Sequence, residues 1–165
     1  MFKHLNLLHL VLALGAAAAV YLALRETRGR VMRPARLGFL PLVAVALAAI
    51  LLLFQLAAKQ PAWMFAVPFA AGLAGGALRG ATMKLQVDQN WGLVRPTGRR
   101  ALIWVSLALP FAVALEIGGA LAGPPGIPWR LAAAAVAILC AGLVVGRALG
   151  LAVRLWRAPH VDLRR

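Results

Sequence analysis

Acidic residues are scarce in this sequence. Its 165 residues include only four aspartates and glutamates against 18 lysines and arginines, so the formal net charge is +14. Charged residues make up only 13% of the chain and hydrophobic residues make up 63%, whereas a typical soluble domain is about 25% charged. A soluble protein of this length cannot hide that much apolar surface from water. The same composition excludes a disordered chain.

Cysteine is almost absent as well. The single cysteine, Cys140, lies within an apolar run, so the chain cannot form an intramolecular disulfide, a paired-cysteine redox site or a cysteine zinc site. We interpret Cys140 as a small buried hydrophobic residue. The histidines are few and scattered, so we expect no metal site, no haem and no other cofactor. No nucleotide-binding or hydrolase motif is present, and we expect no enzymatic activity.

Long apolar runs dominate the chain instead. A membrane-spanning helix needs about 20 residues to cross a hydrocarbon core of about 30 Å, and five runs are close to this length. They cover residues 5–24, 37–58, 62–78, 101–123 and 131–153. We therefore predict an all-α membrane protein, with one polytopic domain over residues 1–165 and five transmembrane helices. The first run is alternatively a cleaved signal peptide, but its positive charge follows the run, which favours a retained helix.

The distribution of basic residues predicts the orientation of these helices. Fourteen lysines and arginines fall in the first loop, in residues 79–100 and in the C-terminal tail, whereas three fall on the opposite side. Because positively charged loops stay in the cytoplasm, we predict an outside N-terminus and a cytoplasmic C-terminus in a bacterial inner membrane. The lipid bilayer is then the main partner. The same rule explains the basic charge without nucleic acid binding.

The longest loop, residues 80–100, has a pattern typical of β-structure. Apolar and polar residues alternate over residues 83–88, residues 89–92 are typical of a turn, and a short apolar segment follows at residues 93–95. Alternation with a period of two predicts strands, so we predict a small cytoplasmic β-hairpin between the third and fourth helices. An irregular loop at the membrane surface is the alternative, because isolated hairpins are only marginally stable.

Glycines recur at every fourth position in the third and fifth runs. These two glycine zippers consist of Gly72, Gly76 and Gly80, and of Gly142, Gly146 and Gly150. A smooth stripe of this kind lets another backbone approach closely, which drives helix association in lipid. Because the stripes lie at matching depths, we expect the third and fifth helices to pack on each other. A homodimer formed through one stripe is the alternative.

Polar residues that interrupt the apolar runs are candidates for function. Glu116 is the only acidic residue within a run, and His9 and Gln55 lie at comparable depths toward the outer side. We predict that these three meet in an outward-facing polar pocket. The pocket is either a proton or ligand site, in which histidine and glutamate exchange a proton, or a set of interfacial hydrogen bonds. Arg147 lies about 16 Å further inward, too far to pair with Glu116, and is expected to extend to the cytoplasmic headgroups.

The order of these features resembles that of a known family. A helix, a basic arginine–proline loop (residues 33–36), a helical hairpin and a strand–turn–strand (residues 82–95) precede the basic pair Arg99-Arg100 and the last two helices. In this order the chain resembles the CcdC-like family of bacterial integral membrane proteins, which is named for its association with cytochrome c biogenesis. No catalytic residues are established for that family, so the resemblance implies none here.

Taken together, the packing glycines and the lack of a chemical motif favour a non-enzymatic role. We expect a small accessory or assembly subunit that binds another membrane protein or forms a homo-oligomer. A small transporter or channel is the alternative. It rests on the polar pocket and on a possible repeat of two similarly oriented helical hairpins.

Overall fold

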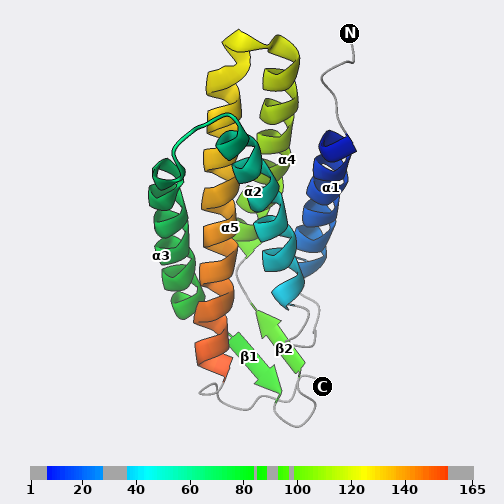
Figure 1. Ribbon diagram of the computed structural model, residues 1–165. Coiled ribbons are helices and arrows are strands. Elements are labelled where there is room, and N and C mark those ends of the chain that lie inside the picture. The colour runs from blue at the N-terminus through cyan, green and yellow to red at the C-terminus, as the bar shows by residue number, and fades with distance from the viewer. Residues whose placement is uncertain (1–6, 28–36, 84, 89–92, 97–98, 156–165) are drawn as a thin grey trace.

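The computed structural model describes residues 7–27, 37–83, 85–88, 93–96 and 99–155. Its long helices are α1 (Leu7–Thr27), α2 (Phe39–Ala57), α3 (Ala66–Thr82), α4 (Arg99–Ala122) and α5 (Ile127–Leu155). Two short 3-10 helices, η2 (Ala62–Phe65) and η3 (Pro124–Gly126), lead into α3 and α5. Figure 1 shows that the long helices form an elongated bundle with two strands at one end.

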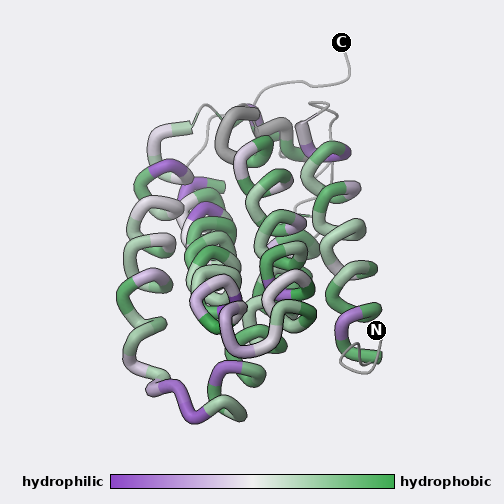
Figure 2. Tube along the Cα trace, turned by 90° about the horizontal axis from the view of Figure 1, so that it is seen from above, coloured by the Kyte–Doolittle hydropathy of each residue, from purple (hydrophilic) through white to green (hydrophobic). Residues whose placement is uncertain are grey.

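The bundle has the surface of a membrane protein. It contains five helical segments that are long and apolar enough to span a membrane, as predicted. Large apolar side chains cover the outside, including Leu7 (77% exposed), Trp63 (73%) and Trp104 (72%), and Figure 2 shows hydrophobic residues on every helix. An apolar surface of this extent suits lipid and not water. The chain is therefore a multi-pass membrane protein.

Several helices extend beyond their predicted ends, whereas α2, at Phe39–Ala57, is slightly shorter than predicted. α1 continues to Thr27, and α3 continues to Thr82, beyond the predicted end at Leu78. α5 begins at Ile127 instead of Leu131, because Pro128 fits the first turn of a helix, where its missing amide hydrogen costs nothing. These extensions bring charged residues that had been assigned to loops into the helices.

α5 is the central helix of the bundle. It packs against α2, α3 and α4, whereas α1 packs against α2 and α4. The buried core is made largely by α1, α2, α4 and α5. Its members include Leu12, Leu51, Leu109 and Val144. α3 lies on the far side of α5 from α1 (Figure 1). It is therefore held mainly through its contact with α5.

The predicted β-hairpin between α3 and α4 is confirmed. β1 (Leu85–Asp88) and β2 (Leu93–Pro96) pair antiparallel, with Val87 opposite Val94. Both valines are buried, and β1 contacts α5, so packing against the bundle stabilises a hairpin that would be marginal alone. The predicted turn at residues 89–92 lies outside the described residues. The side of the membrane on which the hairpin lies remains a prediction.

Candidate functional site

Four polar side chains from four helices gather toward the end of the bundle that holds the α4–α5 turn. They are His9 on α1, Gln55 on α2, Glu116 on α4 and Arg130 on α5, here called the Glu116 cluster. His9, Gln55 and Glu116 are 7%, 3% and 0% exposed. The first three were predicted to share a pocket, whereas Arg130 was assigned to a loop. It lies instead near the start of α5.

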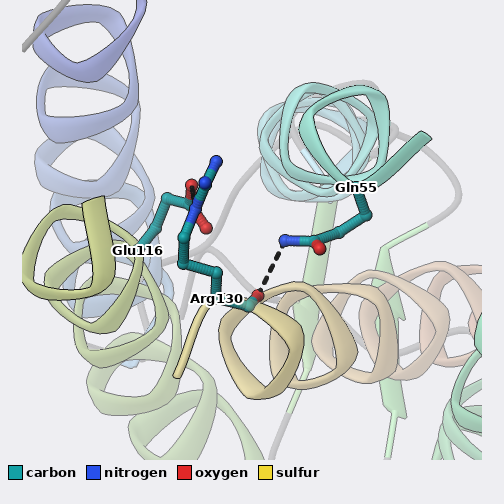
Figure 3. Close-up of polar contacts among 3 residues, drawn as sticks. All are labelled: Gln55, Glu116 and Arg130. Carbon is teal, nitrogen blue, oxygen red and sulfur yellow. Dashed lines mark hydrogen bonds and ion pairs between the residues drawn. The ribbon is translucent and has the colours of Figure 1, made fainter. Parts of the chain in front are cut away.

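Glu116 forms an ion pair with Arg130. Arg130 Nε donates a hydrogen bond to Glu116 Oε1 at 2.7 Å, and the two side chains are 30% and 0% exposed (Figure 3). The carboxylate thus points into the bundle, as expected for a charge that hydrocarbon cannot solvate. Among the described residues, none donates a hydrogen bond to the second oxygen, Oε2.

Gln55 approaches Arg130 from the side opposite Glu116, as Figure 3 shows. Gln55 Nε2 donates a hydrogen bond to the backbone oxygen of Arg130 at 3.0 Å. The neighbouring Phe54 stacks on His9, with ring centroids 5.6 Å apart and an interplanar angle of 24°. Arg130 therefore lies between Gln55 and Glu116, and Phe54 connects His9 to the same end of the bundle.

Two glycines, which sequence reasoning missed, place Arg130 beside Glu116. A Cβ atom on Gly119 would lie 2.5 Å from Cγ of Arg130 and 2.8 Å from the backbone oxygen of Gly126. α4 and η3, which leads into α5, therefore touch backbone to backbone at these glycines. Glu116 and Arg130 lie about one turn inward from this contact on their respective helices, so they reach nearly the same depth. The sequence signal for this close contact was the presence of glycines near the short turn between the fourth and fifth apolar runs.

A second buried ion pair lies toward the other end of the bundle. Arg147 Nη2 donates a hydrogen bond to Glu26 Oε1 at 2.7 Å, and the side chains are 4% and 7% exposed. The prediction that Arg147 extends to the cytoplasmic headgroups is therefore wrong, because its guanidinium turns toward α1. Glu26 was missed because it follows the first apolar run in sequence. The last turn of α1 carries it into the bundle.

The two glycine stripes face each other across the α3–α5 contact. A Cβ atom on any stripe glycine would lie under 3.0 Å from a backbone carbonyl oxygen of the opposite helix. This is true of Gly72, Gly76, Gly80, Gly142, Gly146 and Gly150. The arrangement is the one in which small residues allow two membrane helices to pack at close range.

An apolar groove of about 340 Å³ runs between α2 and the η2–α3 segment. It is called the α2–α3 groove here, and it is lined by Val45, Ala48, Ala49, Leu52, Ala62, Phe65, Ala66, Phe69, Ile138 and Ala141. The last two residues belong to α5, which forms the floor. A second apolar groove, of about 450 Å³, lies between the start of α2 and the end of α5.

Neither metal ligands nor known relatives identify a function for these features. No group of three histidine, cysteine, aspartate or glutamate residues in the described part of the chain is placed to hold a metal ion. No protein-family model, curated protein or solved structure matches the chain. The chemistry of the Glu116 cluster and the shape of the grooves are therefore the guides to function.

Proposed function

We propose that this chain is a small non-enzymatic accessory or assembly subunit that binds another membrane protein in a bacterial cytoplasmic membrane. The observation that carries this proposal is the α2–α3 groove. α2 and α3 are consecutive helices, yet each packs on α5, and the groove opens between them. A transmembrane helix of a partner seated in this groove would contact α2, α3 and α5 together.

The lining of the groove suits such a helix. Five of its ten lining residues are alanine, and small residues let helices approach closely in lipid, where van der Waals packing drives association. Phe65 and Phe69 add larger apolar surfaces along one wall. The alanines therefore let the backbone of a partner helix approach closely, and the phenylalanines give its bulkier side chains a surface to pack against.

The resemblance to the CcdC-like family supports the same role. That family is named for its association with cytochrome c biogenesis, which is an assembly process, and the resemblance extends over most of the chain. An accessory subunit acts through its surfaces and needs no catalytic group of its own. An assembly role is therefore consistent with an apolar groove on the surface of the bundle.

Site-specific photo-crosslinking in native membranes tests this proposal. A photoreactive amino acid at Ala49 or Ala66, which are exposed in the groove, should give a crosslinked product of one defined mass. Ala13 and Ala17 are exposed on α1 and serve as controls that should not give it. In addition, Ala49→Trp should fill the groove and remove the partner from protein purified in mild detergent. Equal crosslinking at groove and control positions would contradict the proposal.

The Glu116 cluster supports a second candidate, a small transporter or channel. Ionisable groups within membrane helices are candidates for function, and Glu116 is fully buried with one oxygen lacking a donor among the described residues. In vesicles containing a pH-sensitive dye, the wild-type protein would then move protons, whereas folded Glu116→Gln would not. Purification as a homo-oligomer with a pore would favour this candidate. Indistinguishable dye signals from the two proteins would leave Glu116 with a structural role.

A further inference from the structure

The Glu116–Arg130 pair combines a group that can accept a proton with a group that can bind an anion, and neither group is fully occupied. Glu116 Oε2 has no hydrogen-bond donor within the described part of the chain. For Arg130, the hydrogen bond to Glu116 uses Nε. No described residue accepts a hydrogen bond from its two Nη groups, and its side chain is 30% exposed.

We propose that this pair is a proton-controlled binding site for one small oxyanion, such as a carboxylate or a phosphate group. While Glu116 is ionised, its carboxylate neutralises the guanidinium of Arg130. When Oε2 takes up a proton, Glu116 becomes neutral and its charge-assisted hydrogen bond weakens. Arg130 keeps its charge, because arginine is not deprotonated in proteins. Its Nη groups then bind an anion in the bidentate geometry that guanidinium favours.

Charge balance makes the two binding events depend on each other. The ionised pair is neutral overall, and uptake of a proton alone would leave a net positive charge at a half-buried site, which is costly. An anion removes that charge. One proton and one anion therefore enter together, and each increases the affinity of the site for the other. A cation is disfavoured, because Arg130 repels it.

Within the described part of the chain, few other charges face this site from the helices that pack against α4. Gln55 is neutral, and its hydrogen bond to the Arg130 backbone holds that residue in place from α2. His9 on α1 is the other titratable residue of the cluster, and it stacks on Phe54. Lys59, in the turn after α2, is exposed. The Glu26–Arg147 pair lies about 26 Å away, measured along α5 at about 1.5 Å per residue.

Anion binding to the full chain in detergent tests the proposal. Methanesulfonate is a suitable probe, because it is a singly charged oxyanion whose charge does not change between acidic and alkaline pH. In isothermal titration calorimetry, its affinity for the wild-type protein should rise up to about tenfold for each pH unit lowered, with one proton taken up per anion. The Glu116→Gln variant has a neutral side chain that imitates the protonated carboxyl group. Its affinity for methanesulfonate should therefore be the same at acidic and at alkaline pH.

Three further variants test whether Arg130 binds the anion and whether Glu116 takes up the proton. The double variant Glu116→Gln/Arg130→Gln keeps the pair neutral but lacks the guanidinium, and it should not bind methanesulfonate. Glu26→Gln makes the same chemical change in the other buried ion pair and should retain the wild-type pH dependence. His9→Gln should also retain it, which would exclude His9 as the source of the proton linkage.

Two outcomes would overturn the proposal. One is a folded Glu116→Gln protein that does not bind methanesulfonate at either pH, and the other is a double variant that binds it as well as Glu116→Gln does. A short-chain phosphatidylglycerol that competes with methanesulfonate would identify lipid headgroups as the natural anion, whereas a lack of competition would indicate a free anion. Ala49→Trp, which fills the α2–α3 groove, should leave methanesulfonate binding unchanged. The proposal of an anion site and the proposal of a partner-binding groove are therefore tested independently.

Discussion

Two buried glutamates in this protein pair with arginines on another helix, and both of these arginines belong to α5. Arg130 pairs with Glu116 of α4, and Arg147 pairs with Glu26 of α1. An unpaired charge within a membrane costs several kcal/mol, so each arginine lies where another helix provides a carboxylate. α1 packs mainly on α2 and α4, and the Glu26–Arg147 pair therefore connects it to the central helix.

The Glu26–Arg147 pair is expected to stabilise the fold only as long as both partners remain. Arg147→Gln should lower the free energy of unfolding by about 3–5 kcal/mol, because it leaves the Glu26 carboxylate buried without a counter-charge. The double variant Glu26→Gln/Arg147→Gln should recover a large part of that loss, since two neutral amides can bond to each other. Denaturant unfolding in detergent measures both values. A double variant as unstable as the sum of the two single variants would show that the residues do not interact.

Substitution of Gly119 tests how Arg130 is positioned. Gly119→Ala should destabilise the protein by about 1–3 kcal/mol, because overpacking a tight contact forces backbone shifts. The new Cβ would meet both Arg130 Cγ at 2.5 Å and Gly126 O at 2.8 Å. Gly118→Ala is the matched control, because its Cβ would meet only the Trp129 ring, at 3.8 Å. Thermal unfolding in detergent distinguishes the two, and equal melting temperatures would show that Gly119 does not determine the α4–α5 contact.

At the scale of the helices, α3 depends on α5 to an unusual degree. Its buried residues are Gly72, Gly76 and Gly80, which have no side chains to contribute to a core. The attraction comes instead from the close approach of two backbones, which brings many atoms into van der Waals range. At the end of α3, Arg154 of α5 donates hydrogen bonds to the backbone oxygens of Gly80 and Met83. The bond to Gly80 satisfies one of the carbonyl groups that the end of the helix leaves free, and the bond to Met83 holds the residue that follows the helix.

Substitution of neighbouring glycines in α3 tests this packing. Gly76→Leu should destabilise the protein by at least about 2–3 kcal/mol or separate α3 from α5, because the new side chain would collide with the α5 backbone. Gly75→Leu should have little effect, because a Cβ at that position meets nothing within 4 Å. Crosslinking between cysteines in α3 and α5, together with thermal unfolding, reports both outcomes. Equal effects of the two substitutions would mean that the stripe does not determine the contact.

For the whole molecule, sequence reasoning succeeded where the signal was local. Apolar runs predicted five spanning helices, and a period of two predicted the hairpin, because both patterns depend on neighbouring residues only. It failed for charged residues near the ends of the apolar runs, whose partners lie on another helix. Glu26 and Arg130 lie at the edges of apolar runs and resemble loop charges. Only the extensions of α1 and α5 and the packing of the bundle show that they form ion pairs with other helices.

The orientation of the whole molecule in the membrane is the last prediction. Fourteen basic residues against three predict that Lys59 faces outside and that position 91 is cytoplasmic. In a Cys140→Ala background, Lys59→Cys should react with a membrane-impermeant maleimide in intact cells, and Trp91→Cys should react only after permeabilisation. Preferential labelling at position 91 in intact cells would reverse the orientation. The result also identifies the side from which protons and anions reach the Glu116 cluster, because Gln55 and Lys59 lie at the same end of α2.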